Sequence, residues 1–165
     1  MESRFKLLGH PIHPMLIVFP LGLLSTAVVF DVIYIITGNR DLSTFSFWAL
    51  VAGLVGGLAA AVFGLVDWMA IPKGTRARRV GAFHGVGNLV VVGLFGLSLL
   101  TRLSASAYLP NVTPFLFGLI GAGLALVTAW LGGELVYRLR VAVDDDAHLD
   151  ASNSIARDGP VTLED

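Results

Sequence analysis

The sequence predicts an all-α integral membrane protein, a four-transmembrane-helix bundle whose N-terminus and C-terminus both lie in the cytoplasm. Three observations lead to this fold class: four long apolar runs, a shortage of charged residues, and an uneven distribution of lysine and arginine. Of the 165 residues, 55% are hydrophobic and 14% are charged, whereas a soluble domain carries roughly a quarter charged residues. The sequence contains no cysteine, which excludes disulfides, covalently attached haem and thiolate metal sites.

Each apolar run is long enough to cross a membrane, because a bilayer core of about 30 Å requires about 20 helical residues. Lipid offers the backbone no hydrogen bonds, so these runs have to be helices. The predicted spans are approximately residues 15–37, 47–71, 80–101 and 114–138. Residues 1–14 form a cytoplasmic segment that contains two His-Pro pairs, and residues 139–165 form an acidic cytoplasmic tail that is predicted to be disordered because it is too polar to build a core.

The orientation follows from the basic residues, which gather on the cytoplasmic side of membrane proteins. One side of the predicted bundle carries eight of them and the other side carries only Arg40 and Arg102. The eight are Arg4, Lys6, Lys73, Arg76, Arg78, Arg79, Arg138 and Arg140. Because these residues form no broad basic patch, we expect the lipid bilayer and no nucleic acid as the partner.

Four ionisable residues lie inside the predicted spans, where such groups are costly and are usually paired or functional. A rise of 1.5 Å per residue puts Asp67, His84 and Glu134 each about 6 Å inside the cytoplasmic boundary. His13 lies at that boundary, so each helix supplies one ligand-type residue to a single layer. The fourth group, Asp31, is expected to make local hydrogen bonds near the outer surface.

The histidines allow two interpretations. His10 and His13 each precede a proline and are therefore expected in polyproline geometry, where they would face one side about 9 Å apart, too far to share a metal unless the segment turns. They are metal ligands or interfacial residues of a rigid helix cap. His84 has Gly81 and Gly85 beside it, which would admit a planar ring, and Asn88 lies one turn deeper; otherwise His84 is a hydrogen-bonded core residue.

The carboxylates and glycines also have structural interpretations. Asp67 and Glu134 would form buried pairs with Arg78, Arg79 or His84. Pairs of glycines four residues apart let helices approach closely, within the chain or in a homo-oligomer. Each predicted hairpin begins with a histidine and ends with a carboxylate, which suggests a repeat related by rotation about the membrane normal.

Four motifs of the chain match a known pattern: Gly9-His10-Pro11-Ile12-His13-Pro14; Asp67-Trp68 followed by Ile71-Pro72-Lys73-Gly74-Thr75-Arg76-Ala77-Arg78; His84; and Trp130-Leu131-Gly132-Gly133-Glu134-Leu135-Val136-Tyr137-Arg138. Over roughly residues 5–140 they resemble the bacterial membrane family called domain of unknown function 2231. The resemblance implies a multi-pass protein of the bacterial cytoplasmic (inner) membrane. Some members resemble fusions to a Rieske-type domain, which implies electron transfer. We expect no such domain here, because the tail has no ligand-bearing motif.

Three functions are compatible with the sequence. The leading hypothesis is a small electron-transfer protein with a membrane or cytoplasmic redox partner, in which haem b is held by His13 or His10 together with His84. Asp67, Glu134 and Asn88 would then support the ligands or handle protons. The second is a non-haem site for iron, zinc or manganese with His13, His84 and Glu134 or Asp67 as ligands. The third is a non-enzymatic scaffold whose polar layer is a structural hydrogen-bond network.

Overall fold

The computed structural model describes residues 1–155. A two-residue β-ladder precedes the helices, with β1 (Lys6–Leu7) antiparallel to β2 (His10–Pro11). The helices are α1 (Ile12–Leu16), α2 (Val18–Thr37), α3 (Arg40–Ala70), α4 (Arg76–Arg102) and α5 (Val112–Gly133), with a 3₁₀ turn η1 (Ser106–Tyr108) before α5 and a π-helical turn η2 (Glu134–Arg138) after it. The final ten residues of the predicted acidic tail lie outside the described residues.

Four helical segments are long and apolar enough to cross a membrane: Ile12–Thr37, Arg40–Ala70, Arg76–Arg102 and Val112–Arg138. The predicted fold class is therefore confirmed. Two helices begin earlier than their apolar runs because polar side chains cap them. The side chain of Asn39 accepts a hydrogen bond from the backbone of Asp41, and that of Thr75 accepts one from Arg78. Pro20 has no N–H to donate to the carbonyl of Leu16, where α1 ends.

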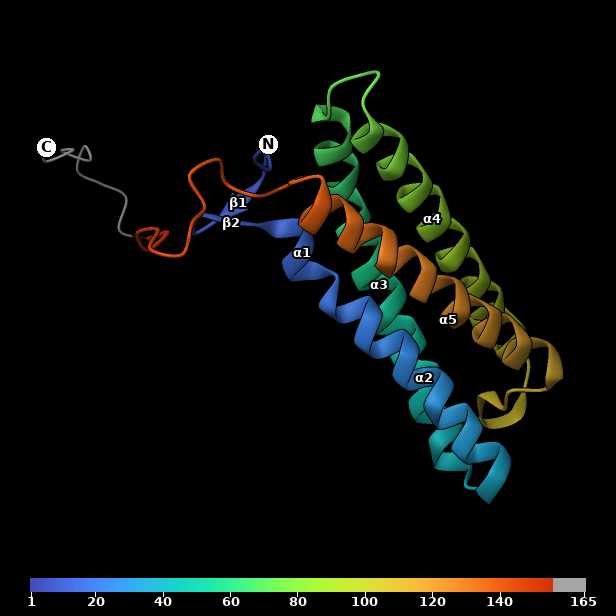
Figure 1. The fold of residues 1–165 in the computed structure, drawn as a ribbon. Coiled ribbons are helices and arrows are strands. Elements are labelled where there is room, and N and C mark those ends of the chain that lie inside the picture. Colours follow the sequence, from blue (N-terminus) through green and yellow to red (C-terminus); the bar gives the residue numbers. More distant parts are fainter. Residues whose placement is uncertain (156–165) are drawn as a thin grey trace, which may run out of the picture.

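The four long helices form two antiparallel hairpins, α2–α3 and α4–α5, which pack side by side (Figure 1). Contacts within each hairpin are far more extensive than contacts between hairpins, where α3 meets α4 and α2 meets α5. Helices α2 and α4 are therefore diagonal neighbours across the bundle. The central core is apolar, and it consists of Leu24, Ala27, Leu50, Leu54, Val91 and Phe95.

The outer surface of the bundle is strongly apolar. In each span, only 17% of the most hydrophobic window is buried inside the protein. Large side chains such as Ile36, Val112 and Leu126 are more than two-thirds exposed. A contiguous apolar surface of this extent indicates contact with lipid.

The N-terminal segment and the residues after η2 meet at one end of the bundle (Figure 1). Lys6 forms an ion pair with Asp144, and the amino group of Met1 lies 3.3 Å from the carboxylate of Asp145. The hydrogen bond to Asp144, with a second one to Glu2, raises the pKa of Lys6. The α3–α4 connection lies at the same end, which is the end that the sequence predicts to be cytoplasmic.

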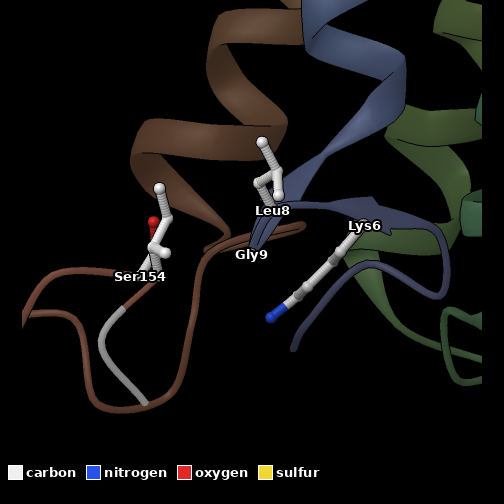
Figure 2. A pocket seen from close by; sticks show the side chains of 5 residues that line it. Lys6, Leu8, Gly9 and Ser154 are labelled. Atoms are coloured by element: carbon white, nitrogen blue, oxygen red, sulfur yellow. The ribbon is translucent and has the colours of Figure 1, made fainter.

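A shallow cavity of about 360 Å³ lies between the N-terminal segment and the tail. Figure 2 shows Lys6, Leu8, Gly9 and Ser154 around it. The lining contains none of the residues that the sequence predicts as ligands. Its walls come from a turn and a polar tail segment, so the cavity does not belong to the helical core.

Arg78 closes the C-terminal end of α3. Its Nη1 atom donates to the carbonyl oxygens of Trp68, Met69 and Ile71 at 2.6, 2.9 and 3.0 Å. Its guanidinium lies 3.9 Å from the centre of the Trp68 ring, whose Nε1 donates back to the carbonyl of Arg78. The helix-end carbonyls, which have no partner within α3, are thus satisfied by the first turn of α4.

Replacement of Arg78 by alanine should destabilise the bundle by about 2–4 kcal/mol, because charge-assisted hydrogen bonds and a cation–π contact are lost together. Thermal unfolding of the detergent-solubilised protein, followed by circular dichroism, measures this loss. Arg79→Ala is the matched control, since Arg79 is exposed on the next position of the same helix turn. Equal unfolding temperatures for the two variants would contradict the capping role.

Candidate functional site

His13 and His84 lie next to each other where the two hairpins meet. Their ring centres are 6.4 Å apart and the ring planes are nearly perpendicular, at 88°. His13 Nδ1 lies 2.8 Å from the carbonyl oxygen of Ala60 on α3, and His84 Nδ1 lies 2.9 Å from that of Thr128 on α5. A carbonyl oxygen can only accept, so each Nδ1 carries the proton and each Nε2 keeps its lone pair when the ring is neutral.

Two glycines make room for these rings. A Cβ atom at Gly64 would lie 2.8 Å from the His13 ring, and one at Gly132 would lie 3.1 Å from the His84 ring. Gly81 and Gly85 were predicted to have a different role, which is to clear space beside His84 for a planar group. Gly81 packs against Trp68, and Gly85 has no neighbouring atom within 4 Å of where its Cβ would be.

Asn88 ties His84 to α5, as expected for a residue one turn deeper. Its Nδ2 donates to the carbonyl of His84 at 2.9 Å and lies 3.2 Å from the Nε2 of the same residue. Its Oδ1 accepts from the hydroxyl of Thr128 at 3.0 Å. Thr128 was not predicted as part of the site, although a threonine within an apolar span was the available signal.

Asp67 binds the N-terminal segment. It does not form the predicted pair with an arginine or with His84. The hydroxyl of Ser3 lies 2.8 and 2.9 Å from the two carboxylate oxygens, which share its one hydrogen, and the backbone N–H of Arg4 donates to the same carboxylate at 3.0 Å. Asp67 is buried. The predicted partners were wrong because the basic residues nearby have other roles, and a backbone donor leaves no signal in a sequence.

Glu134 pairs with Arg76, at 2.6 Å, and not with Arg78, Arg79 or His84. The glutamate lies at the start of the π-helical turn η2, where α5 ends. The arginine is half-exposed, which limits this pair to a modest contribution. Glu134 therefore connects the two ends of the α4–α5 hairpin at the predicted cytoplasmic boundary.

His10 lies apart from the other two histidines. The expected polyproline geometry does not continue to His13, because helix α1 begins at Ile12, after a turn at Leu8 and Gly9 with positive φ. This turn places His10 in β2 and His13 in α1. His10 Nε2 lies 3.2 Å from the hydroxyl of Ser154 on an exposed surface, so the histidine pair of the site is His13 with His84.

A second buried polar group lies toward the other end of the bundle. Asp31 on α2 and Arg102 on α4 form a two-pronged ion pair, with N–O distances of 2.9 and 2.5 Å. Ser46 and Ser98 accept further hydrogen bonds from the same guanidinium at 3.1 Å. Arg102 was predicted as a flanking residue on the non-cytoplasmic side and Asp31 as a group with local hydrogen bonds, yet both side chains are almost completely buried.

The ligand-type side chains that the sequence predicts in one layer do not form a single cluster. Within residues 1–155, no group of three or more His, Cys, Asp or Glu side chains is placed to hold a metal ion. Asp67 and Glu134 already have partners elsewhere. The two imidazoles remain as a pair, with ring centres 6.4 Å apart.

Comparison with known proteins assigns the family. The family described as "Predicted membrane protein (DUF2231)" matches residues 9–145. The chain therefore belongs to this family, as the sequence motifs indicated. No curated protein and no solved structure matches the chain.

Gly64→Ala should displace the His13 ring, because the new methyl group would lie 2.8 Å from a ring that its hydrogen bond to Ala60 holds in place. We expect a loss of about 1–3 kcal/mol in stability, the usual cost of overpacking a close contact. Gly132→Ala should cost less, since the contact there is 3.1 Å. Chemical denaturation of the purified protein measures the order of the variants.

Gly123→Ala is the matched control for these substitutions. It lies in α5 with no atom within 4 Å of the position of its Cβ, and alanine favours a helix over glycine by roughly 1 kcal/mol. Gly123→Ala should therefore be neutral or stabilising. If Gly64→Ala were as stable as Gly123→Ala, the close fit of the His13 ring on α3 would be refuted.

Proposed function

We propose that this protein is a small membrane redox protein in which the imidazoles of His13 and His84 would hold one haem b. The observation that carries the proposal is the geometry of the two imidazoles. They meet from opposite hairpins, and each is oriented by a hydrogen bond from Nδ1 to a backbone carbonyl. Metal-binding histidines are commonly held in this way, because the bond selects the tautomer and orients the ring.

Haem fits this donor set better than a bare metal ion. A haem brings its own four nitrogen ligands and needs two axial ligands from the protein, which is the number that the structure brings together. A non-haem iron or zinc site needs three or four ligands. The carboxylates that the sequence analysis assigned to such a site bind Ser3, Arg4 and Arg76 instead.

The position of the pair also suits a planar group. His13 and His84 belong to different hairpins, and contacts between hairpins are less extensive than contacts within them. A ring system entering between the hairpins would leave the contacts within each hairpin intact. Haem would supply one-electron chemistry there, while His13 and His84 would hold it and the lipid-facing helices would exclude water.

For Asp67 and Glu134, the contacts favour the structural role that the scaffold hypothesis gives to the polar layer. Asp67 secures the N-terminal segment and Glu134 secures the start of α4 through Arg76. Both contacts hold the predicted cytoplasmic end of the bundle together, and both leave the imidazole pair free. We therefore assign these two residues to the framework of the site and only the histidines to ligand binding.

An absorption spectrum of the purified protein, oxidised and then reduced with dithionite, tests the proposal. The protein should be produced with ample haem supply, in nanodiscs or mild detergent. The reduced form should show the sharp band of a six-coordinate b-type haem at a stoichiometry near one. His13→Ala and His84→Ala should each lose that six-coordinate spectrum, because each variant removes one axial ligand.

His10→Ala is the matched control, because His10 is an exposed histidine only three positions from His13. Its spectrum should equal that of the unsubstituted protein. A colourless protein from haem-replete cells would refute the proposal. So would a haem spectrum that survives in the His13→Ala, His84→Ala double variant.

A further inference from the structure

The two hairpins make the same contacts at equivalent positions. A shift of 71 residues takes His13, at the start of the span Ile12–Thr37, to His84 in α4, and a shift of 68 takes Ala60 in α3 to Thr128 in α5. Each histidine donates from Nδ1 to the carbonyl of its own partner residue. The same 68-residue shift takes Gly64, which contacts the His13 ring, to Gly132, which contacts the His84 ring.

The equivalence continues deeper in the bundle. The side chain of Leu24 occupies the space that a Cβ atom on Gly53 would need. The side chain of Phe95 lies in the same way against Gly121. The shifts are again 71 residues for the first helices and 68 for the second. Because packing contacts and hydrogen bonds follow the same pair of shifts, the two hairpins are structural repeats.

The repeats are related by a two-fold axis that runs along the bundle between α2 and α4. In this arrangement α2 maps to α4 and α3 maps to α5, in agreement with the ring of helix contacts. Residues on the axis meet their own equivalents. His13 meets His84 near one end, and Asp31 meets Arg102, also 71 positions apart, near the other.

These two pairs differ in what they can specify. The histidine pair cannot select a partner hairpin. A histidine would face a histidine both when a first hairpin meets a second hairpin and when it meets another first hairpin. The aspartate and the arginine distinguish these cases. Two first hairpins would bury Asp31 against Asp31, and two second hairpins would bury Arg102 against Arg102, and such unpaired charges are very costly in lipid.

We propose that the Asp31–Arg102 ion pair selects the pairing of unlike hairpins and thereby positions His13 opposite His84. The alternative that it prevents is association of like hairpins from two copies of the chain. Buried polar groups are known to select partners in this way, as at polar positions of coiled coils. The proposal concerns the pairing of the hairpins, so it stands or falls independently of any haem.

The absence of cysteine in the sequence makes a direct test simple. His13→Cys places one thiol near the axis, and a short thiol-reactive crosslinker can join two copies there only when two first hairpins meet. In this background, Asp31→Leu with Arg102→Met should retain folding, because apolar residues of similar size often replace a buried ion pair without loss. The crosslinked dimer should increase about tenfold or more on a non-reducing gel.

Two further variants complete the test. The exchange Asp31→Arg with Arg102→Asp restores opposite charges and should return the dimer to the starting level. Arg40→Met with Asp41→Leu removes the same two charges from exposed positions and should leave the dimer unchanged. Light scattering of the same variants without the cysteine checks the mass in detergent.

The proposal would be overturned by a folded Asp31→Leu, Arg102→Met variant with no increase in the dimer. It would also be overturned if the charge-exchanged variant formed as much dimer as the apolar one. Outright unfolding of the apolar variant, with the charge-exchanged variant folded, would assign the pair to folding and not to selection, and would equally refute the proposal.

Discussion

The structure depends on one constraint, which is that polar groups inside lipid have to find partners within the protein. Side-chain hydroxyls and imidazoles meet this constraint by donating to carbonyl oxygens of a neighbouring helix. Ser46 donates to Ala27 at 3.0 Å, and Ser98 donates to Pro114 at 2.7 Å. Each of these bonds joins the two helices of one hairpin, so the same constraint that restricts the polar groups also determines how closely the helices pack.

The fold was largely predictable because its signals are local. The length and the hydrophobicity of a run determine whether its helix can cross a bilayer, and both can be read from the sequence. The helix ends were less predictable, since α3 begins at Arg40, several residues before the apolar run that starts at Phe47. Capping by Asn39 extends the helix beyond the apolar run. A prediction based on hydrophobicity does not detect this polar extension.

The site was predictable only in part, because the partner of a polar group depends on packing. Depth along the helices brought His13 and His84 together correctly, since both lie near the same end. Depth also placed Asp67 in that layer, yet the aspartate turns toward Ser3 in a segment that has no span of its own. The Asp31–Arg102 pair was missed because Arg102 was treated as a loop residue, although it is the last residue of α4 and is fully buried.

The two-fold arrangement makes His13 and His84 equivalent but not their surroundings. The positions that correspond to Asn88 and Thr128 in the first hairpin are Ile17 and Ala60, which offer no polar side chain. His84 is therefore bordered by an amide and a hydroxyl that bond to each other, whereas His13 has a hydrogen bond to one backbone carbonyl. A group held between the two rings would meet a polar side and an apolar side, so the duplicated bundle gives the site a direction that an exact repeat could not provide.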